Sequence, residues 1–217
     1  MGAFHGGLTY RQYRVKESLP NHWQTKVLAG LLNNLAQEVS PTDEDTKSVG
    51  WCSAEFPLDT QLTLEQCLYR DEYLVFSMRV DTLNVPKGML NIYCEAEERR
   101  IKKEQKKEAL NRYERAEVRE QVEQALRKKV LPSIRSTEMV WNWPEGIVRF
   151  FTTNKSLNEE FVELFEESFG LTLIPEYAYT LAQDPNLGLS KKELKQLDVI
   201  EASSFVDSET LFDTMKA

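Results

Sequence analysis

Residues 133–152, SIRSTEMVWNWPEGIVRFFT, contain two extended segments around a turn, and this stretch decides the fold. Met139, Trp141 and Trp143 share one side of the first segment, because side chains two apart in a strand face the same way. In Pro144-Glu145-Gly146, glycine can supply the positive φ of a three-residue hairpin loop. The pattern predicts an antiparallel hairpin with both tryptophans in the core; the alternative use of such aromatics is stacking on single-stranded bases.

A helix is predicted after this hairpin. Apolar residues recur at helical spacing from Leu157, Ser156 and Glu159 have the spacing of a capping box, and Gly170 suits the helix end. Leu171 to Ile174 then predicts a short strand ending at Pro175.

Upstream of the hairpin, two more strands are predicted, at Leu8 to Val15 and at Tyr73 to Val80. A helix between them is expected to start from Ser18 and Pro20 or Asn21 and to run to about Gln37. These elements together predict an α+β fold with antiparallel sheets and packed helices.

Between Val85-Pro86 and Leu131-Pro132 lies the longest helical signal, rich in Glu, Lys, Arg, Gln and Ala. We expect a break near 111–116 and hence two helices, with the region projecting from the fold because its first half is polar nearly all round. The whole chain has 27 basic and 35 acidic residues and a formal charge of −8. Residues 95–130 hold 12 basic and 9 acidic residues, so this segment is net +3 while the other 181 residues carry −11.

The basic residues of this region are the candidate binding site. Arg99, Lys102, Lys103, Lys106 and Lys107 follow the i, i+3, i+4, i+7, i+8 spacing of one helical face. One interpretation is a solvated helix with internal salt bridges; the other is a ridge that contacts nucleic-acid phosphates. The ridge would be extended by further basic residues, namely Arg112, Arg115, Arg119, Arg127, Lys128 and Lys129.

Signals for enzymatic chemistry are weak. The three cysteines share no short spacing and there are two histidines, so neither a disulfide framework nor a metal site nor a cofactor is predicted. No glycine-rich phosphate loop occurs. A metal-dependent nuclease is an alternative, because such an enzyme needs clustered carboxylates to hold its metal ion. The two candidate sets of residues are Asp59 with Glu65, and Asp184 with Glu193 and Lys195.

These features suggest three regions: a central α+β domain from residues 1–94 and 131–182, a helical insertion at 95–130, and an acidic tail at 183–217 with a short helix near Ser190 to Leu197. No apolar stretch approaches the roughly 20 residues of a membrane helix. A cytoplasmic protein is therefore expected.

The order of several motifs resembles the RdgC family of bacterial recombination-associated DNA-binding proteins. The resemblance covers about residues 1–180. Its motifs are the strand around Tyr10 and Arg14, Gly50-Trp51, the strand ending near Val80, Val85-Pro86 before the long charged helix, Leu131-Pro132, Trp141, and Gly170 before Leu171 and Pro175.

The resemblance implies a non-enzymatic, nucleoid-associated protein that binds double-stranded DNA without sequence preference. It also implies a homodimeric ring around the duplex and a role in recombination and replication that includes restraint of the RecA recombinase. Members of the family are sometimes labelled exonucleases, an activity that the sequence does not support.

Two departures from the family limit what carries over. The basic segment after Leu-Pro is shortened to Ser133 to Ser136, so Arg135 alone is a candidate contact there. The family continues where this sequence has an acidic tail, so an open dimer is the alternative to a ring. A second alternative is a protein-interaction factor that binds no DNA. Basic side chains converging on a concave surface would favour DNA, whereas scattered ones would favour protein interaction.

Overall fold

The computed structural model describes residues 2, 8–19, 22–42, 45–182, 187–197 and 199. They form an α+β fold with a seven-stranded antiparallel sheet, as predicted. The chain divides into two compact units, Met1–Ile174 and Pro175–Ala217. The first contains nearly all of the sheet and its core, and the second contains two short helices.

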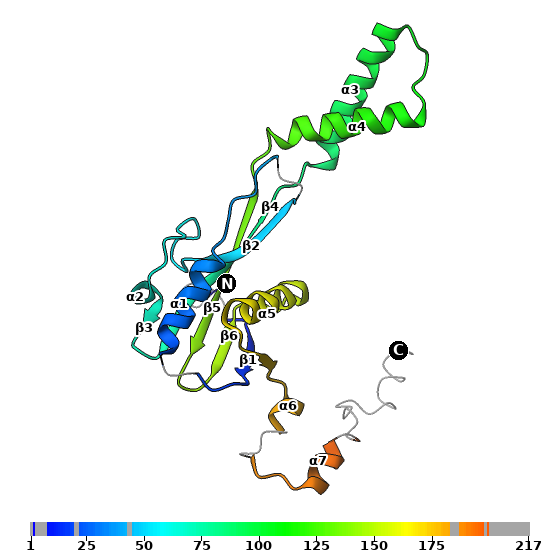
Figure 1. The fold of residues 1–217 in the computed structure, drawn as a ribbon. Coiled ribbons are helices and arrows are strands. Elements are labelled where there is room, and N and C mark those ends of the chain that lie inside the picture. Colours follow the sequence, from blue (N-terminus) through cyan, green and yellow to red (C-terminus); the bar gives the residue numbers. More distant parts are fainter. Residues whose placement is uncertain are drawn as a thin grey trace, which may run out of the picture. The chain divides into compact units, whose positions relative to one another are not determined.

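Five of the seven strands confirm predicted positions with adjusted ends, and the other two, at Lys47–Cys52 and Leu68–Tyr69, were not predicted (Figure 1). Their order in the sheet is β2-β4-β5-β6-β1-β7, with β3 pairing to β4. The bounds are β1 Arg11–Val15, β2 Lys47–Cys52, β3 Leu68–Tyr69, β4 Tyr73–Thr82, β5 Ser133–Asn142, β6 Ile147–Phe150 and β7 Leu173–Pro175. The strand predicted at Tyr73 to Val80 is central, because β4 pairs along its length with β5 and also with β2.

Seven helices are described among the placed residues. They are α1 Trp23–Asn33, α2 Leu64–Cys67, α3 Lys87–Gln105, α4 Arg112–Arg127, α5 Lys155–Phe169, α6 Ala178–Ala182 and α7 Lys191–Leu197. None of these helices is long and apolar enough to cross a membrane. The short helix α7 confirms the one predicted near Ser190 to Leu197.

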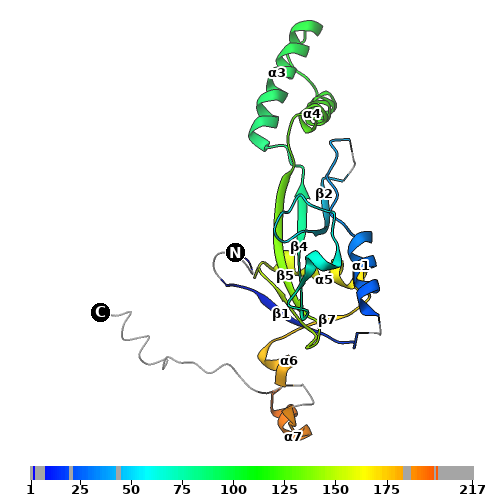
Figure 2. The same ribbon diagram turned by 90° about the vertical axis from the view of Figure 1, so that its left-hand side faces the viewer.

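The main core lies between the sheet and the helices α1 and α5 (Figures 1 and 2). Trp141 on β5 is fully buried, as predicted, and packs against Phe165 and Phe169 of α5. Trp51 on β2 is also fully buried, and its Nε1 donates a hydrogen bond of 2.8 Å to Ser168 Oγ. The aromatic side chains therefore tie α5 to the centre of the sheet.

The other face of β4 holds a buried ion pair that the sequence analysis did not predict. Arg79 is 2% exposed and Asp81 is 1% exposed, and Arg79 Nε donates to Asp81 Oδ1 at 2.7 Å. Arg79 Nη2 donates to the second carboxylate oxygen, and Nη1 donates to the carbonyl of Pro57 at 3.4 Å. The pair therefore holds the segment between β2 and α2 against the sheet.

The first helix differs from its prediction at both ends. It begins at Trp23, so its N-cap residue is His22 and not the predicted Ser18. His22 has a φ of 64°, and its side chain makes no capping hydrogen bond. The other two predicted start residues, Pro20 and Asn21, lie outside the described residues. It ends at Asn33 because the chain then pairs with β2: Trp51 N donates to Asn34 O at 2.8 Å and Ala36 N donates to Trp51 O at 2.9 Å.

The β5–β6 hairpin and helix α5 confirm two predicted glycine positions. Gly146 has φ 66° in the hairpin loop, and Gly170 has φ 62° at the end of α5. The loop has four residues, 143–146, because Trp143 leaves the strand and packs against Trp23, with the rings tilted by 34° at a centroid distance of 4.6 Å. The predicted capping box at Ser156 is wrong, since Asn154 caps α5 by accepting from the Leu157 amide.

The three cysteines are free and buried, as expected for packing residues. Burial raises the pKa of Cys52 to about 12 and that of Cys67 to about 11, and it also raises the pKa of Cys94. At pH 8 only about one Cys52 in 10⁴ is a thiolate, the form that reacts. We therefore predict that Cys52 and Cys67 resist a thiol reagent in the native protein, while all three cysteines react in guanidinium; rapid native labelling of Cys52 would contradict this.

Candidate nucleic-acid interface

Helices α3 and α4 form a helical hairpin that connects β4 to β5 (Figure 1). Pro86 precedes α3, as expected for a helix start. Lys106 ends α3 with a φ of 52°. Asn111 begins α4 with a capping box: its side chain accepts from the Glu114 backbone N–H, and the Glu114 side chain accepts from the Asn111 backbone N–H. The predicted break into two helices is thus confirmed, although it lies at 106–111, before the expected position.

The hairpin has a small hydrophobic core of its own. Leu90 and Cys94 of α3 and Leu126 of α4 are buried together, with Val85 and Val122 packed against them. Val118 of α4 is also buried, with 4% of its surface exposed. This core is separate from that of the sheet, so the hairpin is held together by its own apolar contacts.

The predicted single basic face on residues 99–107 is wrong. Arg99 and Lys103 are four residues apart on α3 and share a face. Lys106 and Lys107 lie beyond the end of the helix, because the chain turns at the left-handed Lys106. A run of good helix formers does not reveal this turn, since the hairpin core and the Asn111 cap determine where α3 stops.

Several of the predicted site residues are already paired with carboxylates. Arg99 contacts Glu95 at 2.5 Å, Lys107 contacts Glu114 at 2.5 Å, and Arg115 lies 4.0 Å from Glu98. The hydrogen bond from Lys107 lowers the pKa of Glu114, so this carboxylate stays ionised at neutral pH. Exposed pairs of this kind add little stability, but they reduce the positive charge available to a phosphate.

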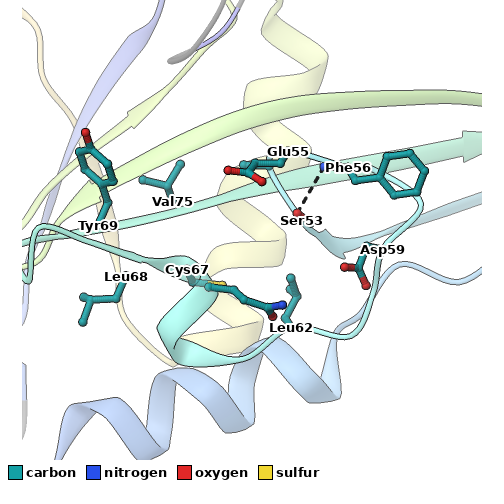
Figure 3. Close-up of a pocket in the computed structure, with 11 residues that line it drawn as sticks. Ser53, Glu55, Phe56, Asp59, Leu62, Cys67, Leu68, Tyr69 and Val75 are labelled. Atoms are coloured by element: carbon teal, nitrogen blue, oxygen red, sulfur yellow. Dashed lines mark hydrogen bonds between the residues drawn. The ribbon is translucent and has the colours of Figure 1, made fainter.

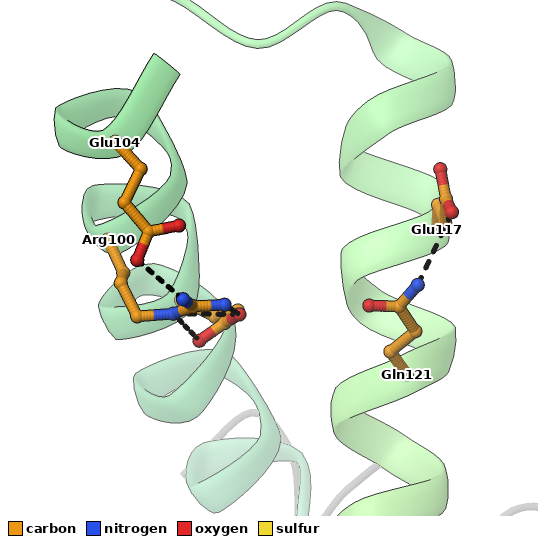
Figure 4. Close-up of polar contacts among 5 residues, drawn as sticks. Arg100, Glu104, Glu117 and Gln121 are labelled. Carbon is orange, nitrogen blue, oxygen red and sulfur yellow. Dashed lines mark hydrogen bonds and ion pairs between the residues drawn. The ribbon is translucent and has the colours of Figure 1, made fainter. Parts of the chain in front are cut away.

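Arg100, which the sequence analysis did not include, is the most highly paired cation of the hairpin (Figure 4). It contacts Glu97 at 2.5 Å and Glu104 at 2.6 Å. Hydrogen bonding to Glu97 raises the pKa of Arg100 and lowers the pKa of Glu97. The sequence spacing could have predicted these pairs, because Glu97 precedes Arg100 by three residues and Glu104 follows it by four, and side chains at these spacings are neighbours on a helix.

The remaining cations divide by position. The tip cluster, at the turn between the helices, consists of Lys102, Lys103, Lys106 and Arg112. Arg119 lies midway along α4, Lys128 and Lys129 follow its end, and Arg135 lies near the start of β5. Within the described part of the chain, none of these eight side chains forms an ion pair. Arg127 is half-buried and has an interaction partner.

A groove of about 430 Å³ runs between the two helices. Tyr93, Ala96 and Ala125 contribute to its apolar surface, and Tyr93 is 48% exposed. Arg100 and Lys129 contribute its cations. On the α4 side, Gln121 donates a hydrogen bond of 3.3 Å to Glu117 (Figure 4). The hairpin thus offers an apolar surface as well as a charged one.

The acidic residues considered for a nuclease do not form a cluster where they are described. Asp59 lines a pocket of about 360 Å³ beside β4, together with Glu55 and Cys67, but Glu65 is not part of it (Figure 3). Glu193 instead accepts hydrogen bonds from Ser190, and Asp184 lies outside the described residues. No group of three or more potential metal-ligating side chains occurs among the residues that were placed.

No protein-family model matches the chain, and no curated protein matches it. The resemblance to the RdgC family therefore still rests on the order of sequence motifs alone.

Proposed function

We propose that the helical hairpin binds double-stranded DNA without sequence preference through its unpaired cations. One observation supports this most directly: the tip cluster, Arg119, Lys128 and Lys129 lie on one hairpin, while the chain outside residues 95–130 carries −11. Unpaired lysines and arginines can bind phosphates and release counterions, which is the main source of non-specific affinity.

The width of the hairpin favours contacts to the backbone over contacts to bases. Each helix with its side chains is about 10 Å across, so two side by side exceed the roughly 12 Å width of the major groove. Phosphate contacts orient a protein on DNA but carry no sequence information. The proposal therefore predicts similar affinities for unrelated duplexes.

The biological part of the proposal depends on the family resemblance. We propose a homodimer, open or ring-shaped, that acts on the bacterial nucleoid in DNA recombination or replication and has the RecA recombinase as a partner. No catalytic activity, metal or cofactor belongs to the proposal. Sedimentation equilibrium of the full chain tests the dimer: a mass near 50 kDa supports it, and a mass of 25.2 kDa at all concentrations contradicts it.

Salt dependence is the direct test of the wild-type protein. If about five phosphates are contacted, the logarithm of the affinity falls against the logarithm of salt with a slope near −4.5. Fluorescence anisotropy with two random-sequence duplexes of equal length, at 50 to 200 mM salt, measures this slope. Equal slopes and affinities for both duplexes are expected, whereas a flat salt dependence or undetectable binding at 50 mM would reject the proposal.

A protein-interaction function is the second candidate, and two observations favour it. The unpaired cations are spread over the tip, the length of α4, the segment after it and the start of β5. The groove between α3 and α4 exposes apolar surface beside charged groups. If DNA does not bind at low salt, this groove becomes the better candidate site.

A further inference from the structure

The pocket of about 360 Å³ beside β4 has the size of a site for a small organic molecule. The buried part of its lining is apolar and comes from Leu62, Cys67 and Val75. Two aromatic side chains, Phe56 and Tyr69, also line the pocket and are exposed. The pocket therefore offers apolar contact area to a molecule that enters from solvent.

A loop that follows β2 carries the charged groups of this pocket (Figure 3). Ser53 Oγ accepts from the Phe56 backbone N–H at 3.3 Å, and the Ser53 backbone N–H donates to the Asp59 carbonyl at 3.0 Å. These hydrogen bonds close the loop, so Glu55 and Asp59 are held on the same short segment. Asp59 Oδ1 accepts from the Gln61 backbone N–H at 2.9 Å, which leaves Oδ2 for another donor.

The lining holds these two carboxylates and no cation. Within the described part of the chain, neither Glu55 nor Asp59 forms an ion pair, and the Glu55 side chain forms no hydrogen bond. Arg70 lies over the Tyr69 ring, with its guanidinium carbon 5.4 Å from the ring centroid, but it does not line the pocket. Two carboxylates without a counterion attract a cation and repel an anion.

An organic cation suits this pocket better than a metal ion does. Among the residues that the structure places, no three potential metal-ligating side chains come together, whereas calcium takes six to eight oxygen ligands. Burial raises the pKa of the Cys67 thiol to about 11, so at neutral pH it remains a neutral, apolar part of the wall. The apolar lining can bury the hydrocarbon part of an organic cation, which a hydrated metal ion lacks.

We propose that this pocket binds a small primary amine in its protonated form, with the ammonium group at the Glu55 and Asp59 carboxylates and the hydrocarbon part against Leu62 and Val75. An ammonium group has three N–H donors, enough to serve both carboxylates. The assignment is independent of DNA binding, because no residue of the helical hairpin lines the pocket.

Backbone ¹H–¹⁵N spectra of the full-length protein at pH 7 test the proposal, with 2-phenylethylamine as the probe. An alkyl amine is protonated at this pH. We expect the amide signals of Ala54 and Leu68, which line the pocket, to shift saturably with a dissociation constant of about 1 mM, as small fragments show. Three analogues should bind at least fivefold more weakly: 2-phenylethanol is neutral, 3-phenylpropanoate is an anion, and methylammonium has no apolar body.

Variants that remove charge but keep shape test the role of the carboxylates. Glu55→Gln should weaken binding about threefold, because Glu55 is exposed and one exposed charge contributes little. Adding Asp59→Asn, which keeps the oxygen that accepts from Gln61, should raise the loss to at least tenfold. The matched control is Glu65→Gln, at an exposed position of α2 outside the pocket, which should change the affinity less than twofold.

Three results would overturn the proposal. The first is that the Ala54 and Leu68 signals of the wild type stay fixed up to 20 mM 2-phenylethylamine, about 20 times the expected dissociation constant. The second is that 2-phenylethanol binds as tightly as the amine. The third is that the double variant of Glu55 and Asp59 binds the amine as tightly as Glu65→Gln does.

Discussion

Reversal of the tip cluster should weaken duplex binding by about 100-fold at 50 mM salt. It should also make the slope of log affinity against log salt less negative by about 3.6. The variant changes Lys102, Lys103, Lys106 and Arg112 to Glu. These cations have no carboxylate partner in the described structure, so each is available to a phosphate. Anisotropy titrations with the same random duplex at several salt concentrations give both quantities.

A matched control separates local contacts from total charge. Changing Lys26, Lys191, Lys192 and Lys195 to Glu alters the formal charge by the same −8, at exposed positions on α1 and α7. We expect this control to lose less than fivefold in affinity. Equal losses in both variants would show that net charge, and not the tip cluster, governs binding.

Folding of the tip variant needs a separate check, since all four changes lie at helix ends. Lys102 and Lys103 lie in the last turn of α3, where a positive charge is favourable, so glutamate there costs about 0.5 kcal/mol each. Arg112 lies in the first turn of α4, where glutamate is favourable. Circular dichroism should therefore show unchanged helix content.

Removing one partner of the buried ion pair should have the largest effect on stability. Asp81→Ala leaves the Arg79 guanidinium at a position that is 2% exposed, with the Pro57 carbonyl as its remaining acceptor. A buried charge without its counterion costs about 3–5 kcal/mol. Urea unfolding followed by tryptophan fluorescence measures the loss.

The double variant Arg79→Met, Asp81→Leu provides the comparison, because it removes both charges and retains apolar volume. We expect it to lose less than half as much stability as Asp81→Ala. A loss below 1 kcal/mol for Asp81→Ala would mean that Arg79 finds water or another acceptor, and that the pair does not hold the segment at Pro57.

Sequence patterns correctly predicted those features of the fold that are determined by residues close together in the sequence. The alternation around Trp141, the positive φ at Gly146 and the αL cap at Gly170 were recognisable because each depends on a few adjacent residues. The end of α1 at Asn33 was not, because it depends on pairing between Asn34 and Trp51, which are distant in the sequence. The Arg79–Asp81 pair was also missed, because alternation alone does not show that both faces of β4 are covered.

The composition of residues 95–130 predicted which segment carries the candidate basic residues, but it did not predict how their side chains are arranged and paired. Which cations are paired depends on the turn at Lys106, because it brings Lys107 next to Glu114 across the helix break. The pairs within α3 follow from spacing and were predictable; the contact of Arg115 with Glu98 between helices was not. Pairing across a turn depends on where the helices stop, which the residue types in this segment do not specify.

The separate core of the hairpin, Leu90, Cys94 and Leu126, has a consequence for how the protein fluctuates. So small a core gives the hairpin a lower free energy of local opening than the sheet, so its amide protons should exchange with deuterium well before those of β4 and β5. A ligand that binds the closed hairpin would slow that exchange by mass action. Such protection would appear in α3 and α4 even when the melting temperature of the sheet does not change.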